Sequence, residues 1–211
     1  MKLIDNDSPL GRFLGTIADI VLLNLLFLVC SLPVVTMGAS FCAMDYVFLK
    51  KQREPHIPVV STFFSAWKQN FKKGTLAWLL MLAAALVIYT DCRFFSMTGP
   101  HPYAPLYYMF LALAVIFACP AVWLLPVIAS FENKLSMLIS QAFFFAVKKL
   151  PQTLFMAALW AACIYYTFAN VNVFIVVLSF WIFFGFGLLA WIDSRLMIGA
   201  FLPYMKKIDT E

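Results

Sequence analysis

The chain of 211 residues is too apolar for an ordinary soluble domain. Hydrophobic residues make up 64% of it and charged residues only 12%, against roughly 45–50% and about 25% in soluble proteins. This composition excludes a soluble globular enzyme and indicates a membrane protein. The net charge of +5 comes from cations beside long apolar runs, which favours membrane lipids with anionic headgroups over nucleic acid as the partner.

Six apolar stretches approach the length of about 20 residues that a membrane-spanning helix needs. We expect the first to stay in the mature protein, since Asp5 and Asp7 precede it and no signal-peptide cleavage site follows it. The second is short and carries Asp45, so it either crosses the membrane or re-enters it against neighbouring helices. The expected fold is all-α, a polytopic transmembrane helix bundle in which residues 1–211 form a single integral membrane domain. The six stretches are Phe13–Ser31, Val34–Leu49, Thr75–Tyr89, Leu106–Ser130, Thr153–Phe168 and Val173–Ile192.

Two further segments have the pattern of amphipathic helices that lie flat at the cytoplasmic membrane surface. In Pro58–Lys73, aromatic side chains recur at helical spacing and lysines gather on the opposite side. The second segment, from about Asn133 to Lys149, again ends in two lysines. The aromatic side chains would reach the acyl boundary while the lysines meet lipid phosphates or a partner. The residues expected to make these contacts are Phe63, Phe64, Trp67, Lys68, Lys72, Lys73, Lys148 and Lys149.

The same two segments belong to a pattern that occurs twice. In each copy an Ala-Ser-Phe tripeptide, at Ala39–Phe41 and Ala129–Phe131, precedes the amphipathic helix, and Lys-Lys, Thr-Leu and an apolar stretch follow it. Both copies run in the same direction. The pattern predicts a weak parallel repeat of residues 34–91 and 106–168, related by an axis along the membrane normal.

The lysines and arginines set the expected orientation. If six helices cross and both termini are cytoplasmic, 14 of the 15 cations lie on one side and only Arg93 lies on the other. The positive-inside rule assigns the cation-rich side to the cytoplasm. If the second stretch does not cross, the N-terminus moves outside and the split becomes 12 to 3. The rest of the topology is the same in both cases.

Motifs along nearly the whole chain form a set that is specific enough to compare with known proteins. They are Ser8-Pro9-Leu10, Arg12-Phe13-Leu14, Asp19 followed by Leu22-Leu23-Asn24-Leu25-Leu26, Cys30 to Ser40, Phe63 to Lys72, Leu125 to Asn133, Leu150 to Leu154, and Phe201-Leu202-Pro203-Tyr204. The set resembles the YesL family of small bacterial integral membrane proteins. Asp45 departs from the family pattern, which has an aromatic residue beside Tyr46. The resemblance implies a bacterial membrane protein without an established activity, of a kind often associated with carbohydrate uptake and utilisation in Gram-positive bacteria.

Three polar residues within the apolar stretches form a candidate intramembrane polar site. An ionisable side chain in mid-helix costs roughly 2.5–3.5 kcal/mol on insertion scales, which makes Asp19 and Asp45 candidates, with Asn24 as a hydrogen-bonding companion. An antiparallel hairpin would bring the two carboxylates together in the cytoplasmic half of the membrane. They would bind a proton, a cation or a polar solute, or alternatively fix packing through Arg12, Lys50 or a hydroxyl. Other charged residues near the ends of the stretches are interpreted as boundary markers, namely Asp91, Arg93, Asp193 and Arg195.

Residues suited to catalysis are scarce. The two histidines, His56 and His101, fall in loops on opposite sides of the membrane, so they cannot share a metal or a triad. The five cysteines have no metal-ligand spacing, and the sequence has no GxxxxGK[ST] motif. We expect no enzymatic activity, no cofactor and no metal.

Three functions remain for a protein of this class. The first is an accessory or scaffold component associated with a carbohydrate transport complex, to which the cytoplasmic helices would dock. The second is a permease-like transporter subunit for a small polar solute, with cytoplasmic helices that couple to a separate ATPase. The third is a structural protein that binds anionic lipids through its basic face.

Overall fold

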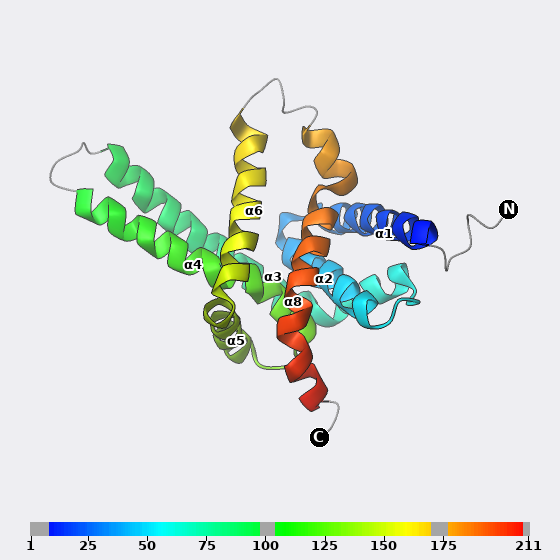
Figure 1. The fold of residues 1–211 in the computed structure, drawn as a ribbon. Coiled ribbons are helices and arrows are strands. Elements are labelled where there is room, and N and C mark those ends of the chain that lie inside the picture. The colour runs from blue at the N-terminus through cyan, green and yellow to red at the C-terminus, as the bar shows by residue number, and fades with distance from the viewer. Residues whose placement is uncertain (1–8, 98–103, 170–176, 209–211) are drawn as a thin grey trace.

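The computed structural model describes residues 9–97, 104–169 and 177–208, and every secondary-structure element within these ranges is helical (Figure 1). The all-α prediction is therefore confirmed. The elements are α1 (Pro9–Cys30), the 3-10 turn η1 (Val34–Thr36), α2 (Met37–Arg53), α3 (Val59–Met97), α4 (Ala104–Ser130), α5 (Leu135–Lys148), α6 (Leu150–Ala169), the π-helical turn η2 (Trp181–Gly185) and α8 (Phe186–Ile208).

Four of the described helices are long and apolar enough to cross a membrane. They are α1, α3, α4 and the last helix, which runs over Val177–Tyr204 through η2 into α8. A fifth crossing is formed if α5 and α6, which meet at an angle of 101°, are counted as one bent span. The predicted stretch Val34–Leu49 is not among them, since α2 has only 17 residues and ends in Lys50, Lys51 and Arg53. Length and composition thus support four to five spans.

Helix α3 joins two elements that the sequence predicts as separate. The interfacial helix over Pro58–Lys73 and the span over Thr75–Tyr89 form one helix of 39 residues. A single glycine costs a helix only about 1 kcal/mol, and Gly74 is packed against α2, where an added Cβ would lie 3.1 Å from the Cα of Ala39. The predicted break at Gly74 is therefore wrong, and this segment cannot lie perpendicular to its own span.

The last helix also continues beyond its predicted end at Ile192. The helical backbone extends to Ile208, so Asp193 and Arg195 lie inside the helix. Asp193 is only 6% exposed. Its interpretation as a boundary marker that reaches water is wrong, because the carboxylate is buried within the bundle, where one of its two oxygens accepts a hydrogen bond from Trp160.

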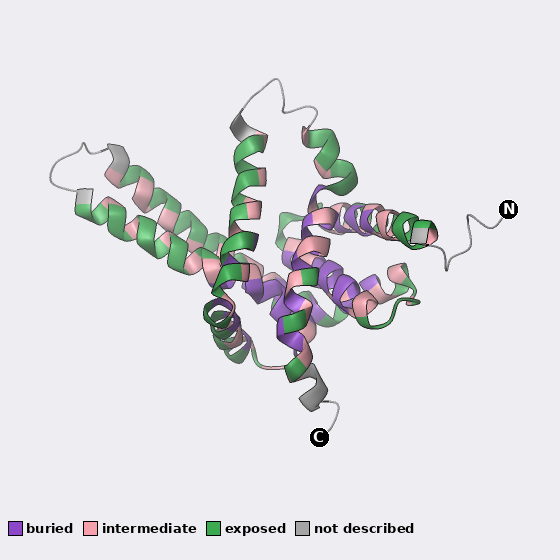
Figure 2. Ribbon diagram, viewed as in Figure 1, coloured by how far each residue is buried: buried purple, intermediate pink, exposed green. Residues whose placement is uncertain are grey.

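Helix α2 forms the centre of the molecule. It packs against α1, α3, α4 and α8, and Figure 2 shows the buried residues concentrated around it. Cys42 and Leu49 join a core cluster with Trp123 of α4, Phe145 of α5 and Phe201 of α8. The adjacent face of α2 contributes to a second cluster, whose buried members are Ile20, Leu23, Phe27, Ala43, Met44, Val47, Phe48, Phe63, Ala66 and Ala190.

The outer surfaces of α3, α4 and α6 are apolar and exposed. Leu86, Val115 and Tyr165, one from each helix, are 63%, 56% and 69% exposed, and the outer parts of these helices are coloured as exposed in Figure 2. In water such a surface would be a large unfavourable apolar patch, whereas in hydrocarbon it costs nothing. The fold is that of a membrane protein.

Candidate functional site

Asp19 forms an ion pair that connects α1 to α2. Its carboxylate accepts a hydrogen bond from the Lys51 ammonium, rather than from Arg12 or Lys50 as the sequence suggests. Both side chains are partly shielded from solvent. Since Lys51 lies six residues after Asp45, the pair is about 9 Å further along α2 than Asp45. The structure thus gives the two predicted carboxylates different partners.

Asn24 is fully buried and inserts into the backbone of the last helix. Its amide donates to the carbonyl oxygens of Trp181 (3.0 Å) and Ile182 (2.7 Å), and its Oδ1 accepts from the Gly187 N–H (2.9 Å). Ile182 and Gly187 are five residues apart, which is the spacing that a π-helical hydrogen bond would join. A side chain that replaces backbone hydrogen bonds of a helix in this way stabilises a π-helical turn such as η2. Asn24 therefore connects α1 to η2.

Asp45 faces a second buried carboxylate that the sequence-based site does not include. Asp45 on α2 is 7% exposed, Asp193 on α8 is 6% exposed, and the two groups interact electrostatically. Trp160 on α6 donates through Nε1 to Asp193 Oδ2 at 2.7 Å, whereas the buried Oδ1 has no hydrogen-bond partner in the described part of the chain. Two carboxylates in a low-dielectric site repel each other unless a proton or a cation reduces their charge.

The polar contact between α2 and α8 extends beyond this pair. Gln52 donates through Nε2 to the Ser194 hydroxyl at 2.8 Å, and the Ser194 hydroxyl donates to the carbonyl oxygen of Trp191. A sequence signal for Asp193 exists in retrospect, because the apolar pattern resumes at Leu196 and continues to Leu202. No group of three or more His, Cys, Asp or Glu side chains in the described ranges is placed to hold a metal ion.

The structure divides the predicted interfacial residues of α3 into buried and exposed ones. Phe63 is fully buried in the core beside α1 and α2, so its predicted contact with lipid or a partner is wrong. Phe64 is 41% exposed. Trp67 is half-buried and donates through Nε1 to the Ser40 hydroxyl at 3.3 Å. The lysines of this segment are exposed, namely Lys68, Lys72 and Lys73.

The predicted contact residues at the end of α5 have contacts within the protein. Lys148 donates to the Tyr204 hydroxyl at 2.7 Å, and its ammonium lies 5.2 Å from the ring centroids of both Phe144 and Tyr204. Lys149 is half-buried at the corner between α5 and α6. Lys148 therefore connects α5 to α8 while its side chain remains exposed at the surface.

The fold and its buried polar contacts define a polytopic helical membrane protein with an unusually polar central helix. A family model described as "Protein of unknown function, DUF624" matches residues 20–92, which cover the second half of α1, all of α2 and most of α3. The chain is also 27% identical to the uncharacterized protein YesL of Bacillus subtilis (strain 168), over 97% of this chain and 95% of that protein. No solved structure matches. Both similarities support the resemblance to the YesL family that the sequence motifs indicate.

Proposed function

We propose that the protein is a non-catalytic accessory or scaffold component of a carbohydrate uptake system in the bacterial cytoplasmic membrane. The link to carbohydrate uptake comes from the family resemblance. The exposed apolar helices support the membrane location, and the distribution of lysines and arginines supports an orientation with both termini in the cytoplasm.

In this proposal α2 is also a crossing, which gives six spans: α1, α2, α3, α4, α6 and the last helix. A helix needs apolar residues all round only where lipid surrounds it. Because α1, α3, α4 and α8 surround α2, its Asp45 and Ser40 meet protein groups instead of lipid. The length from Val34 to Arg53 is about 30 Å, if the three residues of η1 rise 2 Å each and α2 rises 1.5 Å per residue.

The observation that carries the docking role is the position of α5. The angle of 101° places α5 nearly perpendicular to α6, and therefore close to the membrane plane if α6 crosses. The Thr153 hydroxyl holds this corner, since it accepts from Trp123 Nε1 (2.8 Å) and shares its own hydrogen between the carbonyl oxygens of Ala146 and Lys149 (3.0 Å each). The face of α5 turned away from the bundle is apolar and exposed, with Met137, Phe143, Phe144 and Val147.

A photo-cross-linking experiment tests this role. A photoreactive amino acid replaces Val147, which is 67% exposed on α5, or, as the control, Val115, which is 56% exposed on α4. In native membranes we expect the probe at position 147 to capture a component of a carbohydrate transporter, and the probe at position 115 to capture lipid only. Lipid adducts alone at both positions would contradict docking through α5.

A permease-like subunit is the second candidate, and one observation favours it. Asp45 and Asp193 are buried together on α2 and α8, and Asp193 Oδ1 has no partner in the described structure. Such a pair suits a proton or cation that moves with a polar solute. In this case α5 would act as the coupling helix for a separate ATPase.

Uptake measurements separate the two candidates. Asp45→Asn and Asp193→Asn keep the size of each side chain but remove its charge. Asp91→Asn, near the C-terminal end of α3 and outside the buried pair, serves as the control. A permease of this kind loses solute uptake in the first two variants and keeps it in the third. Unchanged uptake in all three variants excludes a carboxylate-dependent route through the protein and favours the accessory role.

A further inference from the structure

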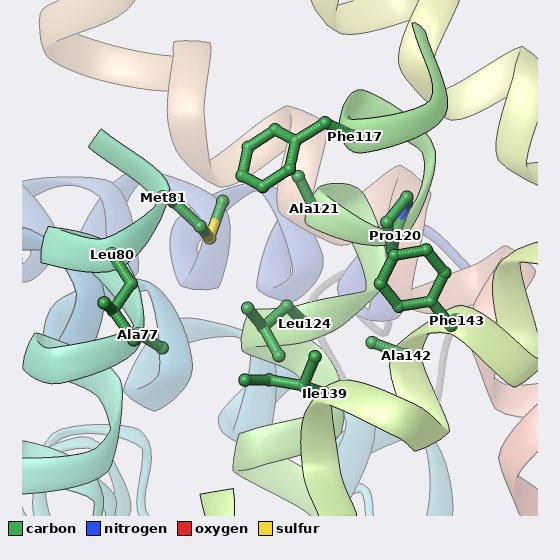
Figure 3. Close-up of a pocket in the computed structure, with 10 residues that line it drawn as sticks. All are labelled: Ala77, Leu80, Met81, Phe117, Pro120, Ala121, Leu124, Ile139, Ala142 and Phe143. Atoms are coloured by element: carbon green, nitrogen blue, oxygen red, sulfur yellow. The ribbon is translucent and has the colours of Figure 1, made fainter. Parts of the chain in front are cut away.

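The end of α2 contributes to a polar cavity of about 320 Å³ that lies against α3 and the end of α4. This volume is at the lower end of the range of roughly 300–1,000 Å³ that is typical of small-molecule sites. A second cavity, between α3, α4 and α5, differs from it in chemistry, because Figure 3 shows only apolar side chains around that space, with Phe143 and Pro120 together on one side. The polar cavity is therefore the better candidate for a specific ligand.

The polar cavity has an apolar floor and a charged rim. Its apolar wall includes Leu49, Ile128 and Phe131, which are 3%, 2% and 6% exposed. Its charged residues come from two separate places in the fold. Lys50, Arg53 and Glu54 lie at the end of α2, and Glu132 follows α4.

The rim presents both signs of charge, on the side of the protein to which the sequence assigns 14 of its 15 cations. Two of the three glutamates in the chain, Glu54 and Glu132, line the cavity. Glu132 is held in place by Gln69, whose Nε2 donates to Oε1 at 2.6 Å. The Lys50 ammonium lies 5.9 Å from the centroid of the Tyr46 ring, which also lines the cavity. A purely anionic ligand would meet two carboxylates here, so a ligand with both charges fits better.

A buried hydroxyl in the cavity wall needs a hydrogen-bond partner. Ser130 lines the cavity, and its hydroxyl is buried beneath the cavity surface with no partner among the residues that the structure describes. An unsatisfied buried polar group costs about 1–3 kcal/mol. Two cations and a hydroxyl together match an anion with several acceptor oxygens, as a phosphate has, better than a carboxylate with two.

We infer that this cavity binds a phosphoethanolamine group. The phosphate lies next to Lys50 and Arg53 and accepts a hydrogen bond from Ser130, the ammonium lies between Glu54 and Glu132, and the apolar wall contacts the hydrocarbon part of the ligand. The same chemistry is present in a phosphatidylethanolamine headgroup of the inner leaflet and in free phosphoethanolamine. The site is independent of the proposed role in carbohydrate uptake, so each proposal can fail without the other.

Binding measurements on the full-length protein in detergent test the site. The probes are dihexanoyl phosphatidylethanolamine, dihexanoyl phosphatidylglycerol and free phosphoethanolamine, each titrated and followed by native mass spectrometry. We expect the ethanolamine lipid to bind more tightly than the glycerol lipid, which has the phosphate but no ammonium. If free phosphoethanolamine binds as tightly as the ethanolamine lipid, the ligand is a soluble molecule; if only the lipid binds, it is a headgroup.

Variants test the roles of the two charges. We expect Glu132→Gln and Lys50→Gln each to weaken binding of the ethanolamine lipid about tenfold, which corresponds to about 1.4 kcal/mol. Glu132→Gln should not weaken binding of the glycerol lipid. Glu54→Gln repeats the test at an exposed position where misfolding is not a concern, and Lys72→Gln, an exposed lysine outside the cavity, is the matched control. Equal affinity for both lipids, or unchanged affinity in Glu54→Gln and Glu132→Gln, would overturn the proposal.

Discussion

Replacement of Asn24 by alanine tests the connection between α1 and the π-helical turn. The variant loses three hydrogen bonds, two donated to the carbonyl oxygens of Trp181 and Ile182 and one accepted from the Gly187 N–H. Hydrogen bonds between membrane helices average about 0.6 kcal/mol each and reach about 1.7 kcal/mol. The three bonds together are therefore worth about 2 kcal/mol, and up to about 5 kcal/mol. A loss of about 2 kcal/mol changes the unfolding equilibrium about 30-fold.

Reversible unfolding by sodium dodecyl sulfate in mixed micelles, followed by tryptophan fluorescence, measures this loss. Thr16→Ala on the same helix is the control, because the Thr16 hydroxyl donates only to the Arg12 carbonyl oxygen within α1. We expect Thr16→Ala to change the free energy of unfolding by less than about 0.5 kcal/mol. Asn24→Asp, which keeps the acceptor but turns a carboxylate oxygen toward the two carbonyl oxygens in a buried site, should be no more stable than Asn24→Ala. The reasoning is refuted if Asn24→Ala is no less stable than Thr16→Ala.

Two other substitutions test the packing around α2 and the corner at α5. Gly38→Ala should lower the free energy of unfolding by about 1–3 kcal/mol, because a Cβ at position 38 would overlap the Gly74 carbonyl oxygen. The control Gly15→Ala, where an added Cβ has no atom within 4 Å, should be neutral or stabilising. Equal effects of the two substitutions in the same unfolding assay would exclude a close crossing of α2 and α3. Thr153→Val should cost about 1–3 kcal/mol, because it leaves the buried Trp123 Nε1 without its acceptor; an unchanged midpoint of thermal unfolding would show that this hydroxyl does not hold the corner.

The sequence predicts the helical boundaries well where strong local signals exist. Helix α1 ends at Cys30, one residue before the end of the predicted stretch, because Ser31-Leu32-Pro33 interrupts the helix. Helix α4 ends at Ser130 as predicted. By contrast, Gly74 and the charged residues Asp193 and Arg195 are weak signals for the end of a helix. Packing against neighbouring helices keeps α3 and α8 helical at these positions.

The polar site shows the same division between local and distant information. Asn24 and Asp45 are recognisable because each is a polar residue in an apolar stretch. Their partners are not, since Asn24 contacts Gly187 and Asp45 faces Asp193, which are more than 140 positions away in the chain. The burial of α2 among four helices also depends on contacts between distant segments. Hydropathy along the chain indicates which helices can face lipid. A helix surrounded by protein, such as α2, need not be apolar on every side, so hydropathy does not identify it as a span.

The orientation of α3 in the membrane is the most direct test of the proposed arrangement. Lys73 and Arg93 are exposed on this helix and lie 20 positions apart, or about 30 Å, which equals the thickness of the hydrocarbon core. In a variant without its five native cysteines, Lys73→Cys and Arg93→Cys are treated in intact cells with a membrane-impermeant maleimide. We expect labelling of Arg93→Cys at once and of Lys73→Cys only after permeabilisation. Rapid labelling of Lys73→Cys in intact cells would contradict both the spanning of α3 and the cytoplasmic position of the lysines.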